Sequence, residues 1–150
     1  MKITLLAVGR LRRGPERELI ADYLDRFAKA GRGLGLPPVQ VTEVEGRPSE
    51  AEALTRALPE GAIVIALDER GDRWSSPDLA RNIARIRDDA RDLCLVIGGA
   101  DGLDPALRDR ADHLLGLGPM VWPHMLVRVM LAEQLYRAAS ILAGAPYHRA

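Results

Sequence analysis

Residues 121–150 read VWPHMLVRVMLAEQLYRAASILAGAPYHRA, and this stretch decides the architecture of the chain. Pro123 and His124 mark the start of a helix, and Gly144 and Pro146 mark its end. Apolar side chains recur at helical spacing between these signals, so the sequence predicts one long helix. The residues that carry this spacing are Leu126, Val129, Met130, Leu131, Leu135, Ala138, Ala139 and Leu142.

Polar side chains are few on this helix, and Glu133 can pair with Arg137 four residues later. Because contiguous apolar surface is normally covered, we expect the helix to be wrapped by its own domain or pressed against a second subunit. The tail at residues 146–149 is different. It carries aromatic, titratable and cationic groups with nothing apolar to hold them in a core.

The 150 residues predict a single domain, 1–150, that buries a core without disulfides or structural metal. The single cysteine, Cys94, lies in an apolar run and is expected to be a buried core residue in a reducing compartment. The three histidines are scattered, so no metal is expected. The apolar run at residues 3–8 is too short for a signal peptide or a membrane span, which indicates a cytoplasmic protein with no membrane partner. Zero net charge argues against indiscriminate binding to nucleic acid.

Strands and helices alternate along the chain. The run from Lys2 to Gly9 is typical of a strand buried on both faces of a parallel sheet, whereas residues 39–44 alternate as in an edge strand. This order predicts an α/β fold with a mostly parallel sheet and helices on both faces. The other strands are expected at 62–67, 93–97 and 113–117, and the helices from Pro15 to Gly31, at 49–58, 75–91 and 105–111, and between Pro123 and Gly144.

Three strand ends are specialised: residues 67–71, the glycine-rich 98–102, and 117–123. If their strands are parallel and adjacent, the three loops meet at one edge of the sheet and form a pocket rich in accessible backbone. Such a pocket suits a small planar ligand read by amide and carbonyl groups. A tight turn with no ligand is the alternative for residues 98–102, whose spacing is not the dinucleotide fingerprint.

A further loop, residues 10–14, has three arginines in four residues beside a glycine. This composition is consistent with a phosphate-binding loop. A solvated loop explains the composition equally well.

Five motifs follow one another in a specific order along the chain. They read LDERG at 67–71, IGGADG at 97–102, PHxxxR at 123–128, EQxYRA at 133–138 and PYHR at 146–149. This combination resembles the ribosomal RNA large-subunit methyltransferase H family, and the resemblance extends over the opening strand and the whole length of the chain. That family belongs to the SPOUT superfamily of S-adenosylmethionine-dependent methyltransferases.

The resemblance implies a C-terminal trefoil knot, an exception to the rule that connections do not thread loops. It also implies a homodimer that methylates N3 of a pseudouridine in helix 69 of 23S rRNA on the assembled ribosome. The zero net charge fits recognition of a shaped ribosomal surface, so isolated rRNA is expected to be a poor substrate. Two alternatives stay open. One is a nucleotide-binding regulatory module that uses the glycine loop for a phosphate, and the other is a methyltransferase acting on a different RNA base.

The resemblance places the cofactor, S-adenosylmethionine, at Leu67, at Gly99 and along residues 118–123. Relatives tend to carry Ser or Thr hydroxyls where this chain has Gly118 and Val121, so backbone contacts are expected there. Trp122 either flanks the cofactor or plugs the core. The full set of predicted cofactor residues is Leu67, Gly99, Gly118, Pro119, Met120, Val121, Trp122 and Pro123.

Methyl transfer from a sulfonium needs no metal, but the imide N3 must lose its proton. His148 in the tail is the candidate base. Arg149, or Arg128 on the last helix, is the candidate to stabilise the anion or hold phosphate, and Tyr147 to stack on a base. A solvated, partly frayed terminus is the alternative for the tail. A structural role at the helix start is expected for His124.

Overall fold

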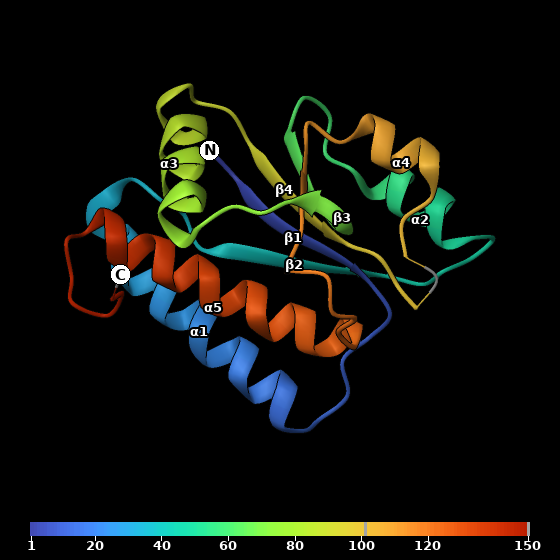
Figure 1. Cartoon of the computed structure of the whole chain (residues 1–150), viewed down its shortest axis with the longest axis horizontal. Coiled ribbons are helices and arrows are strands. Elements are labelled where there is room, and N and C mark those ends of the chain that lie inside the picture. Colours follow the sequence, from blue (N-terminus) through green and yellow to red (C-terminus); the bar gives the residue numbers. More distant parts are fainter. Residues whose placement is uncertain (101, 150) are drawn as a thin grey trace.

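The computed structural model describes residues 1–100 and 102–149, which fold around one five-stranded sheet (Figure 1). All paired strands are parallel, in the order β2-β1-β4-β3-β5, which confirms the predicted fold class. Asp101 of the glycine motif and Ala150 lie outside the described residues. The elements are β1 (Ile3–Val8), α1 (Pro15–Gly31), the 3-10 turn η1 (Arg32–Leu34), β2 (Val39–Val44), α2 (Glu50–Ala57), β3 (Ile63–Asp72), α3 (Ser76–Asp88), β4 (Leu93–Ile97), α4 (Pro105–Arg110), β5 (His113–Leu115) and α5 (His124–Leu142).

Burial of the strands follows their place in the sheet. Every residue of β1 and β4 is buried, because each of these strands has a neighbour on both sides and helices over both faces. The strand β2 lies at the edge and exposes its four central residues, as predicted. Cys94 in β4 is buried, and burial raises the pKa of its thiol to about 11, which confirms the expected core cysteine.

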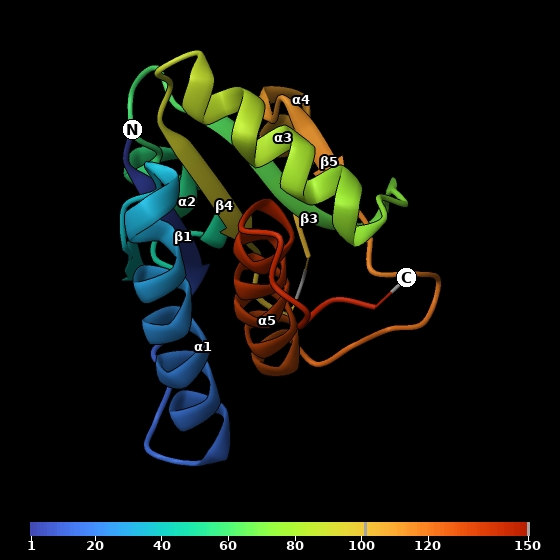
Figure 2. The ribbon, with the colours of Figure 1, turned by 90° about the vertical axis from the view of Figure 1, so that its left-hand side faces the viewer.

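The two faces of the sheet have separate cores and separate helices (Figures 1 and 2). On one face Leu5 packs in a cluster with Phe27 of α1 and with side chains of α3 and α5. On the other face Leu6 packs with Leu54 of α2 and Leu107 of α4. Alternate residues of β1 therefore support opposite layers, as the period-two geometry of a strand requires.

The helix α5 has the long span that the sequence predicts. Pro123 is its N-cap residue, and Gly144 with a φ of 68° follows its last turn. Leu131 and Leu135 are 1% and 0% exposed, in the core formed with α1 and α3. Leu126 near its start is 40% exposed. The domain thus wraps the middle and end of the helix and leaves apolar surface at its start.

Two strand boundaries differ from the prediction. The strand β3 runs to Asp72 rather than to Leu67, and β5 ends at Leu115 rather than at Leu117. The polar run 68–71 is typical of a turn. Leu67 and Asp72 both pair with Leu115 of β5, so residues 68–71 form an irregularity within β3, and beyond it the Gly116 amide donates a 2.9 Å hydrogen bond to the carbonyl oxygen of Asp72.

The backbones of Gly71 and Gly116 lie in direct contact at this point. A Cβ atom on Gly71 would be 2.5 Å from the carbonyl carbon of Leu115 and 2.6 Å from the amide nitrogen of Gly116. Only glycine allows this approach. The C-terminal knot implied by the family resemblance stays a prediction.

Candidate functional site

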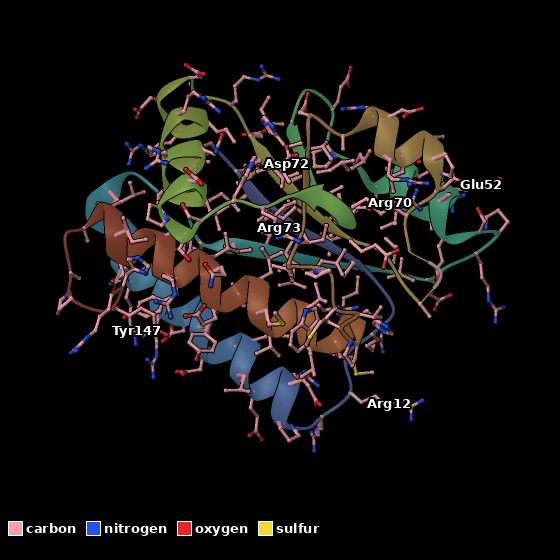
Figure 3. All side chains as sticks on the ribbon, in the orientation of Figure 1. Arg12, Glu52, Arg70, Asp72, Arg73 and Tyr147 are labelled. Carbon is pink, nitrogen blue, oxygen red and sulfur yellow. The ribbon has the colours of Figure 1, made fainter. Side chains whose placement is uncertain are left out.

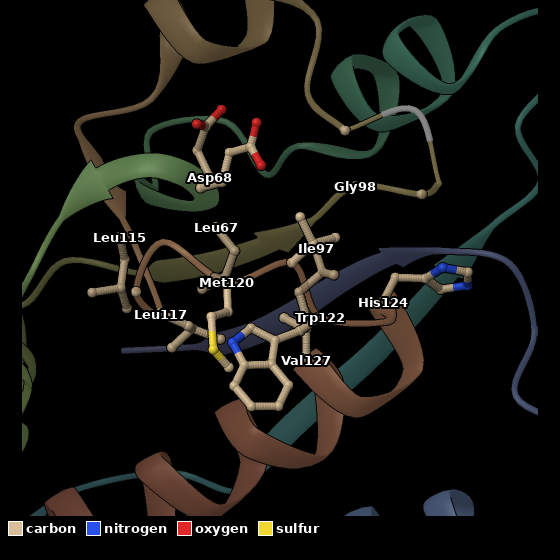
Figure 4. A pocket seen from close by; sticks show the side chains of 15 residues that line it. Leu67, Asp68, Ile97, Gly98, Leu115, Leu117, Met120, Trp122, His124 and Val127 are labelled. Atoms are coloured by element: carbon tan, nitrogen blue, oxygen red, sulfur yellow. The ribbon is translucent and has the colours of Figure 1, made fainter.

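The strands β4, β3 and β5 are neighbours in the sheet, and the loops after them enclose a cavity of about 140 Å³ (Figure 4). All three predicted loop regions contribute to its lining, and the first turn of α5 adds His124 and Val127. The cavity therefore lies beyond the carboxyl ends of the strands, where open α/β sheets bind their ligands.

Six of the eight predicted cofactor residues line this cavity. Pro119 instead faces a neighbouring hollow between α1, α3 and α5, and Pro123 serves as the N-cap of α5. Sequence reasoning did not single out Asp68, Ile97 and Val127, which also line the cavity, although the first two stand in the quoted motifs. The six lining residues are Leu67, Gly99, Gly118, Met120, Val121 and Trp122.

Two glycines of the lining differ in what an added side chain would meet. A Cβ on Gly99 would lie 2.4 Å from Oε1 of Glu50, the first residue of α2. Gly118 has a φ of 97°, a conformation that other residues rarely adopt. Gly118 thus fits the backbone of this loop.

One wall of the cavity is acidic. The Asp68 carboxylate is only 7% exposed, accepts a 2.8 Å hydrogen bond from the Arg70 amide, and lies 3.7 Å from Nε of Arg108. Because these contacts fix its position, Asp68 offers a placed acceptor to a ligand hydroxyl or cation. Within residues 1–100 and 102–149, no group of three or more His, Cys, Asp or Glu side chains is placed to hold a metal ion.

The opposite side of the cavity is apolar and exposed. Met120, Val121 and Trp122 are 64%, 83% and 39% exposed. Figure 4 shows Met120 and Trp122 together beside Leu117 at the cavity, across from Asp68. Such unburied apolar side chains on a loop are typical of a segment that packs against something else.

The predicted role of Arg128 as an anion-stabilising or phosphate-binding group is wrong. Its side chain is 3% exposed and points into the protein. It donates hydrogen bonds to Glu43 over 2.7 Å, to the carbonyl oxygen of Val8 over 2.7 Å and to that of Gly9 over 2.6 Å. The Leu11 amide donates to the same Glu43 carboxylate. The guanidinium therefore ties α5 to the loop after β1.

The C-terminal tail is docked on α5 rather than frayed. The Tyr147 hydroxyl donates to Glu133 over 3.0 Å, and the Tyr147 ring lies 4.7 Å from that of Tyr136 between ring centroids. The predicted pair of Glu133 and Arg137 is present at 2.6 Å. Burial and the hydrogen bond to Glu133 raise the pKa of Tyr147 to about 12.

His148 is held by Arg137, whose Nη1 lies 3.2 Å from Nδ1 of the imidazole. A guanidinium can only donate, so Nδ1 accepts and the proton of the neutral ring is on Nε2. Arg149 is exposed.

The structure does not bring the tail and the cavity together within one chain. The cavity contacts Val127, whereas His148 contacts Arg137, ten residues further along α5. At 1.5 Å per residue these positions are roughly 15 Å apart along the helix axis. Figures 1 and 3 show the C-terminus and Tyr147 towards the end of α5 that is remote from the cavity.

Solved structures with this arrangement are methyltransferases by their names. One is a probable methyltransferase from Bordetella pertussis, with a TM-score of 0.57, 15% identity and coverage of 92% of this chain and 94% of that chain. Another is a probable methylase family protein from Haemophilus influenzae, with a TM-score of 0.57 and 12% identity over 99% of this chain and 70% of that chain. At these identities the likeness concerns the fold.

The family follows from the sequence comparisons. The family model for predicted SPOUT methyltransferases matches residues 1–148. Proteins named ribosomal RNA large subunit methyltransferase H from Paracoccus denitrificans and Roseobacter denitrificans are 64% and 66% identical, over 99% of both chains in each case. The chain belongs to the SPOUT methyltransferase family, as the motifs predict. None of its described helices is long and apolar enough to cross a membrane.

Proposed function

We propose that this chain is a methyltransferase that uses S-adenosylmethionine to methylate N3 of a pseudouridine in helix 69 of 23S rRNA on the assembled ribosome, in the cytoplasm. The observation that carries the proposal is the near full-length identity of over 60% to relatives named for methylation of large-subunit rRNA. A cavity at the strand ends of a SPOUT domain supports it.

The residues of the cavity fit the proposed methyl donor. Gly99 and Gly118 of the lining place no side chain between their amide and carbonyl groups and an adenine ring, and Asp68 can accept from ribose hydroxyls. The cavity of about 140 Å³ is below the roughly 300 to 1,000 Å³ of sites that hold such ligands. The donor is therefore expected to extend out of the cavity against the exposed Met120 and Trp122 side chains.

S-Adenosylmethionine supplies an activated methyl group, so the protein has to align the acceptor and remove the N3 proton. In the docked tail the Nε2 atom of His148 carries a hydrogen and Nδ1 is occupied by Arg137, so the ring has no free lone pair for that proton. We therefore propose that His148 acts as the base only after the tail leaves Arg137. Tyr147 and Arg149 move with it, and are proposed to stack on a base and to stabilise the imide anion.

A homodimer is proposed to complete the site. Exposed Met125 and Leu126 continue the apolar surface of Val121 and Trp122 from the cavity onto α5, and a hollow of about 530 Å³ adjoins it between α1, α3 and α5. A second copy would cover this surface. Because the tail lies roughly 15 Å along α5 from its own cavity, the tail of the partner is the proposed source of the base.

The direct test is mass mapping of 23S rRNA from a strain that lacks the protein, with and without a plasmid copy. The proposal expects one methyl group on a helix 69 pseudouridine to disappear and to return with the wild-type gene. Purified protein is expected to methylate ribosomes and to leave naked helix 69 RNA largely unmodified. Equal activity on both substrates contradicts the requirement for an assembled ribosome, and an unchanged methyl pattern in the deletion strain refutes the function.

Calorimetry separates the alternative of a nucleotide-binding module. We expect the titration with S-adenosylmethionine to release or absorb heat of binding, and the titrations with ATP and NAD to show none. Selective binding of ATP or NAD contradicts the methyltransferase assignment.

A further inference from the structure

The arginine-rich loop after β1 lies beside the proposed methyl-donor cavity. The strands β1 and β4 pair in parallel, with Ala7 opposite Ile97, and Ile97 lines the cavity. The loop at residues 9–14 therefore leaves the sheet next to the glycine-rich loop of the cavity. Figure 1 shows it passing the start of α5 on its way to α1, and in Figure 4 His124 projects from that end of α5.

Four exposed arginines, Arg10, Arg12, Arg13 and Arg17, gather at this loop and the first turn of α1. Within residues 1–100 and 102–149, none of their side chains has a carboxylate within 4.0 Å or a hydrogen-bond partner in the protein. Figure 3 shows Arg12 extended away from the body of the protein. Their guanidinium groups are thus available to an external anion.

Two of these arginines face a concave surface. Arg10 and Arg17 line a hollow of about 430 Å³ whose other walls include Ile20, Leu24 and Val41. Val41 is 44% exposed although it is apolar. A hollow with apolar walls and guanidinium groups at its rim matches a nucleotide, because guanidinium groups bind phosphate in a two-pronged geometry and the apolar wall accepts a ribose or base.

Hydrogen bonds hold the start of the loop in place. Arg128, buried one turn after His124 on α5, donates to the carbonyl oxygens of Val8 and Gly9, and Glu43 accepts from both Arg128 and the Leu11 amide. This carboxylate also lines the hollow, but Arg128 already neutralises it. The arginine-rich loop therefore has a fixed position relative to the cavity.

We infer that Arg10 and Arg17, with Arg12 and Arg13 beside them, form a site for the phosphodiester backbone of the RNA substrate next to its target base. The inference rests on the proposed function. Because the chain has zero net charge, its attraction to RNA depends on local clusters of cations such as this one. Arg128 and Glu43 are positioning residues for this loop.

The test combines the changes R10Q and R17Q in the full-length protein and measures ribosome methylation over a range of salt concentrations. The KM for ribosomes is expected to rise about tenfold, and kcat at saturating ribosomes and the Kd for S-adenosylmethionine are expected to stay within about twofold. Each lost phosphate contact lowers the slope of log affinity against log salt by roughly 0.7 to 0.9. The matched control is R32Q, an exposed arginine at the other end of α1, which is expected to change neither quantity.

The pair R10K and R17K keeps the charges, and is expected to retain the salt slope while losing part of the affinity. An unchanged KM and slope in the glutamine variant, with active wild-type protein, overturns the inference. A similar loss in R32Q overturns it as well. Failure of the wild-type protein to methylate ribosomes at all refutes the proposed function instead, so the two failures are distinguishable.

Discussion

Replacing Gly71 with alanine tests the backbone contact between β3 and residues 114–116. The new Cβ would lie 2.5 Å from the Leu115 carbonyl carbon, 2.6 Å from the Gly116 nitrogen and 2.8 Å from the Leu114 carbonyl carbon. All three are backbone atoms, so no side-chain rotation relieves the overlap. Overpacking of this kind costs about 1 to 3 kcal/mol. Losing the hydrogen bond from Gly116 to Asp72 adds about 1 kcal/mol, for a total of about 2 to 4 kcal/mol.

The same displacement reaches the cavity, because Leu117 and Gly118 continue from Gly116 into its lining. Urea unfolding at one fixed protein concentration measures the stability, and calorimetry with S-adenosylmethionine measures the effect on the site. The matched control is Gly33→Ala, where a Cβ meets no atom within 4 Å. It is expected to leave the unfolding free energy unchanged or to raise it by up to about 1 kcal/mol. If Gly71→Ala unfolds within about 0.5 kcal/mol of the wild type and binds the donor equally well, the reasoning from this backbone contact is wrong.

Three further predictions concern α5 and the residues around it. Leu135→Ala is expected to lower the free energy of unfolding, measured by urea titration, by about 2 to 5 kcal/mol, because Leu135 is 0% exposed. A loss below about 1 kcal/mol would contradict its position in the core. Partial burial raises the pKa of Glu43, but the hydrogen bonds from the Leu11 amide and Arg128 outweigh this effect and hold the pKa below its ordinary value of 4.5. The ionised carboxylate therefore stabilises the fold fully above pH 4.5, and this stabilisation is lost as the pH falls through the lowered pKa. The stability gap between wild type and Glu43→Gln in pH-dependent urea titrations should therefore narrow as the pH falls below 4.5, and a constant gap would rule this out. Tyr147→Phe removes the hydroxyl that donates to Glu133, so proteolysis of the tail should become faster. An unchanged cleavage rate would show that this hydrogen bond does not hold the tail on α5.

Much of the fold could be predicted because its signals are local. The continuous apolar runs of β1 and β4, the alternation in β2 and the start and stop residues of α5 each reflect the burial of a few consecutive side chains. The convergence of three loops followed from one further step, the rule that parallel adjacent strands end at the same edge. The cavity lining confirms that step through Leu67, Gly99 and Gly118.

What the sequence did not reveal depends on partners far away in the chain. The run 68–71 is typical of a turn, and β3 continues past it because Asp72 pairs again with Leu115 of β5. Arg128 sits among the polar residues of α5 and resembles a surface arginine. It is buried because Glu43, 85 residues earlier, and the carbonyl oxygens at the end of β1 satisfy its donors. No local pattern encodes either contact.

The correction of Arg128 changes how the chain can handle phosphate. A buried guanidinium that serves three acceptors cannot also bind an RNA phosphate without leaving the Glu43 carboxylate and two carbonyl groups unpaired, which costs several kcal/mol. Its contribution to RNA binding is therefore indirect, through the position of the loop that carries Arg10. In the docked tail Arg137 likewise occupies Nδ1 of His148. Both arginines that belong to α5 motifs thus act on neighbouring segments of the protein in the docked state, and the proposed phosphate contacts are left to the arginines of residues 10–17.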